Sequence, residues 1–127
     1  MKIAIIGSRD FKDIKKVVEL VKSFSKDTII VSGGAPGVDS VAEMTAQSCG
    51  LNTKIFPADW TNLTHPNAVI KTNKYGKKYD SSAGLRRNED IIKYADEVYA
   101  FWDGISLGTR NSIGHSHRLN KKITIIR

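Results

Sequence analysis

The chain has 127 residues, of which 40% are hydrophobic, and its 20 Lys and Arg against 13 Asp and Glu give a formal net charge of +7. This length and apolar content suffice for one domain with one core, and no apolar run approaches the ~18 residues that a membrane-spanning helix needs. The apolar start is too short for a signal peptide and runs into a charged loop, so no secretion is expected. Cys49 is the only cysteine, which excludes an internal disulfide and a cysteine-based metal site and favours a reducing, cytoplasmic setting.

The positive charge has two interpretations. It favours anionic partners such as nucleotides, nucleic acids or phosphorylated metabolites. It equally serves to keep a small domain soluble. Charge alone therefore selects no ligand.

The first half of the chain alternates short apolar runs with amphipathic stretches. Each apolar run is rich in β-branched residues and ends at Gly, Ser or Pro, which predicts a buried strand. The first amphipathic stretch follows Asp13, a candidate N-cap, and the second ends at Gly50. The expected strands are 2–6, 28–31 and 53–56, and the expected helices are 13–24 and 38–49.

The second half starts with residues 58–83, which lose periodicity and are expected to be a long loop or insertion with a short strand at Ala68–Lys71. Such a length is unusual inside a compact domain and is often functional or mobile. The remaining expected elements are a helix from near Gly84 to about Ala95, a central strand at Glu97–Trp102, a helix capped by Thr109 and ending near Leu119, and a last strand at Lys122–Ile126.

Five strands alternating with four helical stretches predict a parallel sheet with helices on both faces. The simplest arrangement is a single Rossmann-like, three-layer α/β domain over residues 1–127, with strand order 3-2-1-4-5 and an insertion at about 61–83. Ligands in such sheets bind beyond the carboxyl ends of the strands where the order reverses. The loops there are 7–10 and 103–109, with 32–39 alongside.

These loops suit phosphate, because two of them are glycine-rich and lead into helices. A helix start presents unpaired N–H groups and a partial positive charge, and glycine lets a ligand approach the backbone. Neither loop is a Walker A or a G-x-G-x-x-G sequence, and a plain tight turn is the alternative for each. The candidate binding residues in the three loops are Gly7, Ser8, Arg9, Ser32, Gly33, Gly34, Ala35, Gly37, Val38, Asp39, Asp103, Gly104, Ser106, Gly108 and Thr109.

Side chains that suit other parts of a nucleotide lie in or near these loops. Arg9, Arg87 and Arg110 are candidates for charge-assisted bonds to phosphate. The alternative is a solvated surface cation, which is favoured for Arg110. Ribose hydroxyls have candidate acceptors in Asp39, Asp59 and Asp103; Asp39 has the alternative role of complementing a helix dipole. Trp60 is expected either to stack a base or to close the core.

Other features suggest less. His115 and His117 are two residues apart and do not form a metal pair on a helix, and no metal site is expected. Nothing is similar to a nucleophile elbow. The lysines at 71, 74, 77 and 78 form either a solvated loop or a nucleic-acid contact.

With these residues in place, the chain resembles the SLOG superfamily of Rossmann-like nucleotide-binding proteins, and within it the YspA/YpsA-related, DUF2493-like group. The matching pieces occur in family order and cover nearly the whole chain outside 61–82. They are Ile6–Phe11, Ser32–Asp39, Ala58–Trp60, Ala83–Gly84 with Arg87–Asn88, and Phe101–Gly104 with Gly108–Thr109. The resemblance implies a nucleotide or nucleotide-sugar ligand, held by these residues, and a homo-oligomer.

One departure bears on catalysis. The superfamily includes the LOG phosphoribohydrolases, which follow their glycine-rich loop with a glutamate three residues beyond the threonine. Here Ser112 stands at that offset from Thr109, and no acidic residue follows Asp103. A hydrolase of that type needs a carboxylate to activate water or stabilise the oxocarbenium ion.

Three hypotheses follow. The first is a binding module, without a cofactor, that senses or sequesters a phosphorylated nucleoside such as an ADP-ribose-like or cyclic nucleotide signal, in bacterial or phage conflict. The second is an N-glycosidic nucleotide hydrolase that uses Arg87 with Asp39, Asp59 or Asp103. The third is single-stranded nucleic-acid binding as in the related DprA proteins, which the charge permits but for which no aromatic stacking platform is visible.

Overall fold

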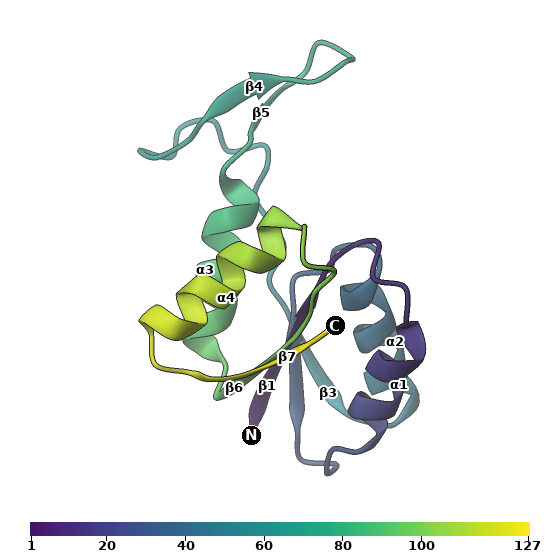
Figure 1. The fold of residues 1–127 in the computed structure, drawn as a ribbon. Helices are drawn as coiled ribbons and strands as arrows, with labels where there is room; N and C mark the ends of the chain where they lie inside the picture. The colour runs from purple at the N-terminus through teal and green to yellow at the C-terminus, as the bar shows by residue number, and fades with distance from the viewer.

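A five-stranded parallel sheet runs through the computed structural model, which describes residues 1–127 (Figure 1). Across the sheet the strands lie in the order β3 (Asn52–Ile55), β2 (Ile29–Ser32), β1 (Lys2–Gly7), β6 (Glu97–Phe101) and β7 (Lys122–Ile126). Because β6 and β7 are the fourth and fifth strands of this sheet along the chain, the predicted order 3-2-1-4-5 is confirmed. The order reverses between β1 and β6, as expected.

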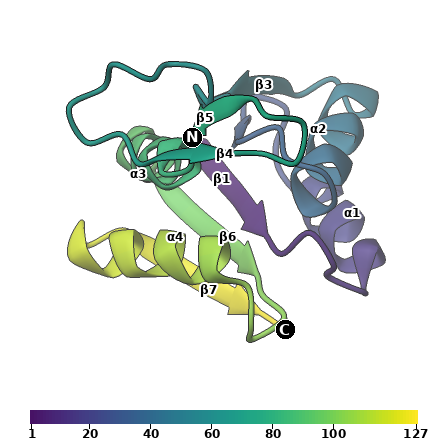
Figure 2. The ribbon, with the colours of Figure 1, turned by 90° about the horizontal axis from the view of Figure 1, so that it is seen from above.

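Two pairs of helices cover the two faces of the sheet (Figures 1 and 2). One pair is α1 (Ile14–Lys22) with α2 (Val38–Ser48), and the other is α3 (Ala83–Tyr94) with α4 (Leu107–Arg118). The fold is therefore the predicted Rossmann-like three-layer arrangement. None of these helices is both long and apolar enough to cross a membrane.

Strand β1 shows why the core has two halves. Its side chains alternate between the two faces, as in any strand. Ile3 and Ile5 belong to the apolar cluster under α1 and α2, whereas Ala4 and Ile6 belong to the cluster under α3 and α4. A continuous apolar run is thus required, because this central strand is buried on both sides.

Of the two predicted helix caps, Asp13 is right in position only, and Thr109 is wrong. Asp13 stands at the N-cap position of α1 but makes no capping hydrogen bond; its carboxylate lies 3.8 Å from the ammonium of Lys16. Helix α4 begins at Leu107 with Ser106 at the N-cap, so Thr109 lies inside the first turn. The other expected elements are present, with ends that differ by a few residues.

Residues 61–83 are not only loop. They contain an antiparallel hairpin of β4 (Ile70–Thr72) and β5 (Lys78–Asp80), with Lys71 opposite Tyr79. The strand expected at Ala68–Lys71 therefore begins two residues later and ends one residue later, and its partner β5 was not predicted. The hairpin stands away from the domain, beyond the start of α3 and at the end of the sheet where β1 terminates (Figure 1).

Candidate functional site

A cleft of about 250 Å³ lies where β1 ends, at the reversal of strand order. Its walls come from the loop after β1, the loop into α2, one face of α3 and the start of α4. The lining residues are Ile6, Gly7, Arg9, Ala35, Pro36, Asp39, Arg87, Asn88, Ile91, Ser106, Gly108, Thr109 and Ser112.

Nine of the residues expected from the sequence to bind the ligand line this cleft. They are Gly7, Arg9, Ala35, Asp39, Arg87, Asn88, Ser106, Gly108 and Thr109. The other candidates lie beside or away from it: Ser8, Ser32, Gly33, Gly34, Gly37, Val38, Asp59, Trp60, Asp103 and Gly104. The structure therefore brings together residues from all three loops and from α3.

Asp39 is buried in the wall of the cleft, with 7% of its surface exposed. Its Oδ2 accepts hydrogen bonds from the backbone N–H of Gly33, at 3.1 Å, and of Ala35, at 3.2 Å. Burial raises the pKa of Asp39 from 3.8 to about 6, although these bonds and the Arg87 charge act in the opposite direction. Two amides that the sequence offered to a phosphate are thus held by the protein's own carboxylate.

The loop before α4 is organised in the same way. Oδ1 of Asp103 accepts the N–H groups of Ile105 and Ser106, both at 2.8 Å, and these bonds lower the pKa of Asp103. The N–H of Asp103 donates in turn to Oγ of Ser8, at 3.1 Å, which joins this loop to the one after β1. Two of the three predicted ribose acceptors, Asp39 and Asp103, therefore bind loop amides.

The amides of the first helical turns remain open. Neither α2 nor α4 has a side-chain cap, and the first helical N–H groups that find acceptors are those of Val41 and Arg110. The N–H groups of residues 38–40 and 107–109 therefore have no acceptor within the protein. Unpaired amides at two helix starts beside one cleft give it a positive potential.

Arg87 ties α3 to the loop before α2. Its Nη1 donates to the carbonyl oxygens of Gly33, at 2.6 Å, and Phe56, at 3.3 Å. Burial lowers the pKa of this guanidinium, and the Asp39 charge partly restores it. A Cβ on Gly33 would stand 2.5 Å from Nη1. Residue 33 is glycine because Arg87 crosses it.

Gly37 has a similar reason. Its φ is +90°, and a Cβ there would lie 2.5 Å from the carbonyl oxygen of Arg9. The loop after β1 and the loop before α2 therefore touch through their backbones. Gly33 and Gly37 thus allow other parts of the protein, Arg87 and the backbone of Arg9, to come close to this loop. These contacts fix the position of the loop at the cleft.

Unlike Arg87, Arg9 has a side chain that is free to bind a ligand. Its side chain is exposed, lines the cleft and forms neither a hydrogen bond nor an ion pair with the protein. The lining holds one carboxylate, Asp39, against the two arginines. Across the cleft, Nδ2 of Asn88 donates to the carbonyl of Gly108, at 3.4 Å, which holds α3 against α4.

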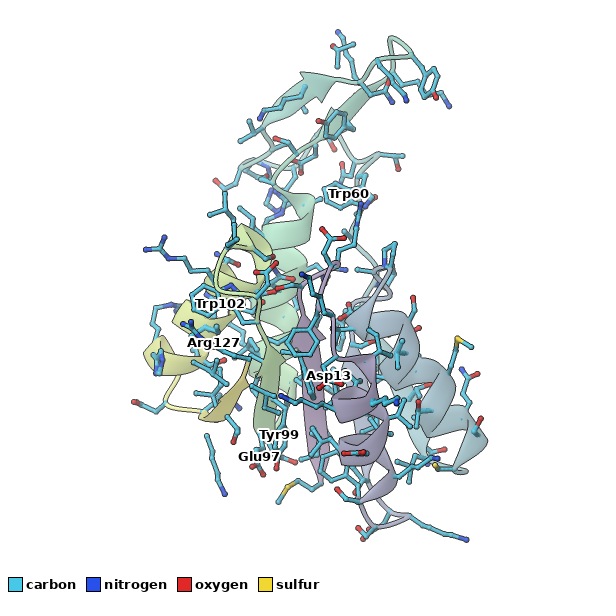
Figure 3. The ribbon with its side chains drawn as sticks, turned by 45° about the vertical axis from the view of Figure 1, so that its right-hand side comes forward. Asp13, Trp60, Glu97, Tyr99, Trp102 and Arg127 are labelled. Carbon is cyan, nitrogen blue, oxygen red and sulfur yellow. The ribbon has the colours of Figure 1, made fainter.

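Asp59 and Trp60 lie outside the cleft. Trp60 is 45% exposed and its ring rests on Gly84, near the base of the hairpin (Figure 3). Asp59 lines a separate cavity of about 390 Å³, together with His65 and Arg86. Only Arg87 lines both cavities.

Sequence reasoning missed some of the lining. Ser112 is buried in the cleft wall, one helical turn after Thr109, so the i, i+3 spacing would have indicated it. Pro36 adds a rigid apolar edge. Ile6 and Ile91 form the floor from the core, where no sequence pattern separates a lining residue from an ordinary core residue.

The fold has known relatives among solved structures. DNA processing protein A (DprA) from Streptococcus pneumoniae superposes with a TM-score of 0.79 and 21% identity, over 99% of this chain and 50% of that one. The DprA structure from Helicobacter pylori, reported for its single-stranded DNA binding mode, gives a TM-score of 0.75 and 24% identity, over 98% of this chain and 64% of that one. A structural-genomics target called TM1055 gives 0.68 and 19%, over 96% and 71%. The chain thus spans half to two thirds of the DprA structures, and at these identities the likeness establishes the fold.

Sequence comparison supplies the family. None of the curated proteins matches the chain. Residues 1–63, which hold the loops 7–10 and 32–39, match the model of the YAcAr family, described as the YspA, cpYpsA-related SLOG family. The amino-terminal half of the chain, residues 1–63, therefore matches the YspA, cpYpsA-related SLOG family, which confirms the resemblance predicted from its sequence motifs.

Proposed function

We propose that the chain binds a phosphorylated nucleoside or a nucleotide-derived ligand in the cleft between the starts of α2 and α4. The observation that supports this proposal is that open first-turn amides from two helices lie at one cleft, which also holds the free Arg9. The residues of these first turns that line the cleft are Asp39, Gly108 and Thr109. Helix starts of this kind bind phosphate.

The size of the cleft limits which part of the ligand it holds. Pockets that enclose a whole drug-sized ligand measure about 300–1,000 Å³. A cleft of about 250 Å³ accommodates a phosphate and a sugar, and leaves a base to lie outside. Such a ligand is ADP-ribose-like or a cyclic nucleotide, and the chain acts as its sensor or sequesters it.

Arg9 is the side chain that tests this proposal cleanly, because it has no role in holding the fold. Arg87→Ala would free the Gly33 loop and confuse binding with folding. A charge-assisted hydrogen bond contributes about 1.5–3 kcal/mol, which is roughly a 10- to 150-fold change in Kd. Arg9→Ala is therefore expected to weaken binding by about tenfold or more, and Lys12→Ala, an exposed cation on the same loop, to leave it unchanged.

Calorimetric titration with AMP, ADP-ribose, cyclic AMP and adenosine measures the Kd of each ligand for the unsubstituted protein, Arg9→Ala and Lys12→Ala. Phosphorylated ligands are expected to bind and adenosine is not. Binding of adenosine as tight as that of AMP would show that phosphate is not recognised, and the proposal would fail. If Arg9→Ala and Lys12→Ala weakened binding equally, Arg9 would contribute only through the overall positive charge of the surface and not through a specific contact.

Hydrolysis is a second candidate that one observation favours. Asp39 has a pKa of about 6 and lies in the cleft beside Arg87, which suits a general acid or base near neutral pH. Against it, the carboxylate already accepts two amide bonds, and Ser112 occupies the position of the LOG glutamate. Chromatography for free base after incubation with AMP, NAD and ADP-ribose decides between binding and turnover. Release at ordinary enzyme rates, abolished in Asp39→Asn, would establish the hydrolase.

A further inference from the structure

The hairpin of residues 69–81, here called the arm, contributes no residue to the cleft. It projects from the domain beyond the start of α3 (Figure 1), and every residue from 70 to 78 is exposed. Its strands pair only with each other, so neither face of this two-stranded ribbon is covered by another layer. An isolated two-stranded hairpin is marginally stable in water, so its orientation requires an anchor.

Asp80 supplies that anchor. It is fully buried and accepts hydrogen bonds from the N–H groups of Val69 and Ser82, both at 3.0 Å, as well as an ion pair from Nη2 of Arg86 on α3. Oγ of Ser81 donates to the carbonyl of Val69, at 2.9 Å. The two ends of the arm are thus tied to each other, and Asp80 fixes them to Arg86 on α3.

The arm concentrates positive charge. It carries four lysines, whereas no acidic residue occurs between Asp59 and Asp80. None of these lysines forms an ion pair, and the charge of Asp80 is taken by Arg86. The arm therefore contributes about half of the net charge of +7 without internal neutralisation. Its lysines are Lys71, Lys74, Lys77 and Lys78.

These cations point in opposite directions. Lys71 pairs with Tyr79, and Thr72 with Lys78, in the antiparallel register. Paired residues share a face and successive residues alternate, so Lys71 and Lys78 lie on opposite faces of the ribbon. The tip adds Lys74, whose ammonium lies 5.1 Å from the ring of Tyr75, a side chain that is 79% exposed.

We propose that the arm inserts into the major groove of duplex DNA. A ribbon with cations on both faces and at its tip matches a slot whose two walls are anionic, whereas a flat anionic membrane would engage one face only. The major groove of B-DNA is about 12 Å wide and 8.5 Å deep and admits a two-stranded ribbon, while that of A-form RNA is too narrow. Four residues from the base to the tip span about 13 Å, which exceeds the depth of the groove.

The arm proposal is independent of the nucleotide proposed for the cleft. It also differs from the single-stranded DNA binding named for the Helicobacter pylori neighbour, because the ligand proposed for the arm is a duplex. A free nucleotide in the cleft and a duplex on the arm are separately testable.

The test compares two variants of equal charge. The arm variant is Lys71→Gln, Lys77→Gln, Lys78→Gln, and the control is Lys12→Gln, Lys15→Gln, Lys26→Gln, all exposed lysines on the amino-terminal side of the domain. Neither variant touches Asp80 or Arg86. Thermal melts establish that both variants are folded.

Fluorescence anisotropy measures binding to a labelled DNA duplex, the matching single strand, an RNA duplex of the same sequence, and vesicles containing phosphatidylserine. The arm variant is expected to lose about tenfold or more in duplex affinity at moderate salt, and its slope of log K against log salt to shrink by about 3, one unit for each lysine. The control is expected to lose much less. Equal losses in both variants would overturn the proposal. So would absence of duplex binding by the unsubstituted protein, or a larger loss for the single strand, the RNA or the vesicles than for the DNA duplex.

Discussion

The pH dependence of stability offers a direct test of how Asp39 sits in the cleft wall. Replacing Asp39 by Asn keeps an oxygen for the amides of Gly33 and Ala35 but removes the buried charge. Because burial raises the pKa of Asp39 from 3.8 to about 6, the unfolded chain releases this proton at a lower pH than the folded one. Ionisation of Asp39 then favours the unfolded state as the pH rises.

The magnitude follows from the shift. A difference of about 2.2 pKa units corresponds to about 3 kcal/mol at 1.36 kcal/mol per unit. The unsubstituted protein is therefore most stable, relative to Asp39→Asn, at acidic pH, and it loses this advantage as the pH rises through 6. Roughly 2 of the 3 kcal/mol develop between pH 4.5 and 7.5, because part of the change occurs nearer to the unfolded pKa.

Urea unfolding of both proteins across this range measures the difference, with Asp10→Asn, at an exposed position, as the control. The difference between Asp39→Asn and the unsubstituted protein is expected to change by about 2 kcal/mol over this range, and that for Asp10→Asn to stay constant. A difference for Asp39→Asn that does not depend on pH would mean that the carboxylate is not buried as described. A change of the opposite sign would mean that the positive charge of Arg87 lowers the pKa of Asp39 more than burial raises it.

Three further predictions concern packing and the cleft. Gly33→Ala places a Cβ 2.5 Å from Arg87 and is expected to lower the urea midpoint by the equivalent of about 1–3 kcal/mol; an unchanged midpoint would show that Arg87 can move aside. The Cβ of Gly108→Ala meets no protein atom within 4 Å, so this variant should keep or raise the melting temperature but weaken nucleotide binding in calorimetry. Gly114→Ala is the control: its Cβ is equally unobstructed in α4 but lies outside the cleft, so binding should stay unchanged. Asp80→Asn removes the anion that Arg86 holds and is expected to speed tryptic cleavage in the arm several-fold while the circular dichroism of the domain persists; cleavage at the original rate would show that Ser81 and Ser82 suffice as the anchor.

Much of the site was accessible from local patterns. Glycines mark the strand-to-helix loops in the sequence. Because the carboxyl ends of parallel strands lie at one edge of the sheet, nine predicted residues from these loops and α3 line one cleft. The placement of Asp59 and Trp60 was not accessible, because it depends on where the chain goes after β3 and not on the residues themselves. The partner strand β5 was missed since its sequence, Lys-Tyr-Asp, has no apolar alternation; an exposed ribbon buries neither face and needs none.

The glycines show most clearly which features the sequence predicts and which only the tertiary structure reveals. Their presence between β2 and α2 follows from the sequence alone, and so does the inference that something approaches the backbone there. The identity of what approaches, Arg87 at Gly33 and the Arg9 backbone at Gly37, comes from segments 54 and 28 residues away along the chain. The same holds for the amides: local sequence shows that donors are available, but only tertiary packing decides which of them meet the Asp39 carboxylate and which stay open.

By itself, then, the sequence determined the parallel sheet, its strand order and the edge at which the cleft lies, because hydrophobic periodicity and the handedness of crossovers act within neighbouring segments. Tertiary structure alone decided which loops border the cleft, which of its amides are bonded, the raised pKa of Asp39 and the position of the arm. Those properties arise from contacts and burial between residues far apart in the chain, which no local pattern encodes.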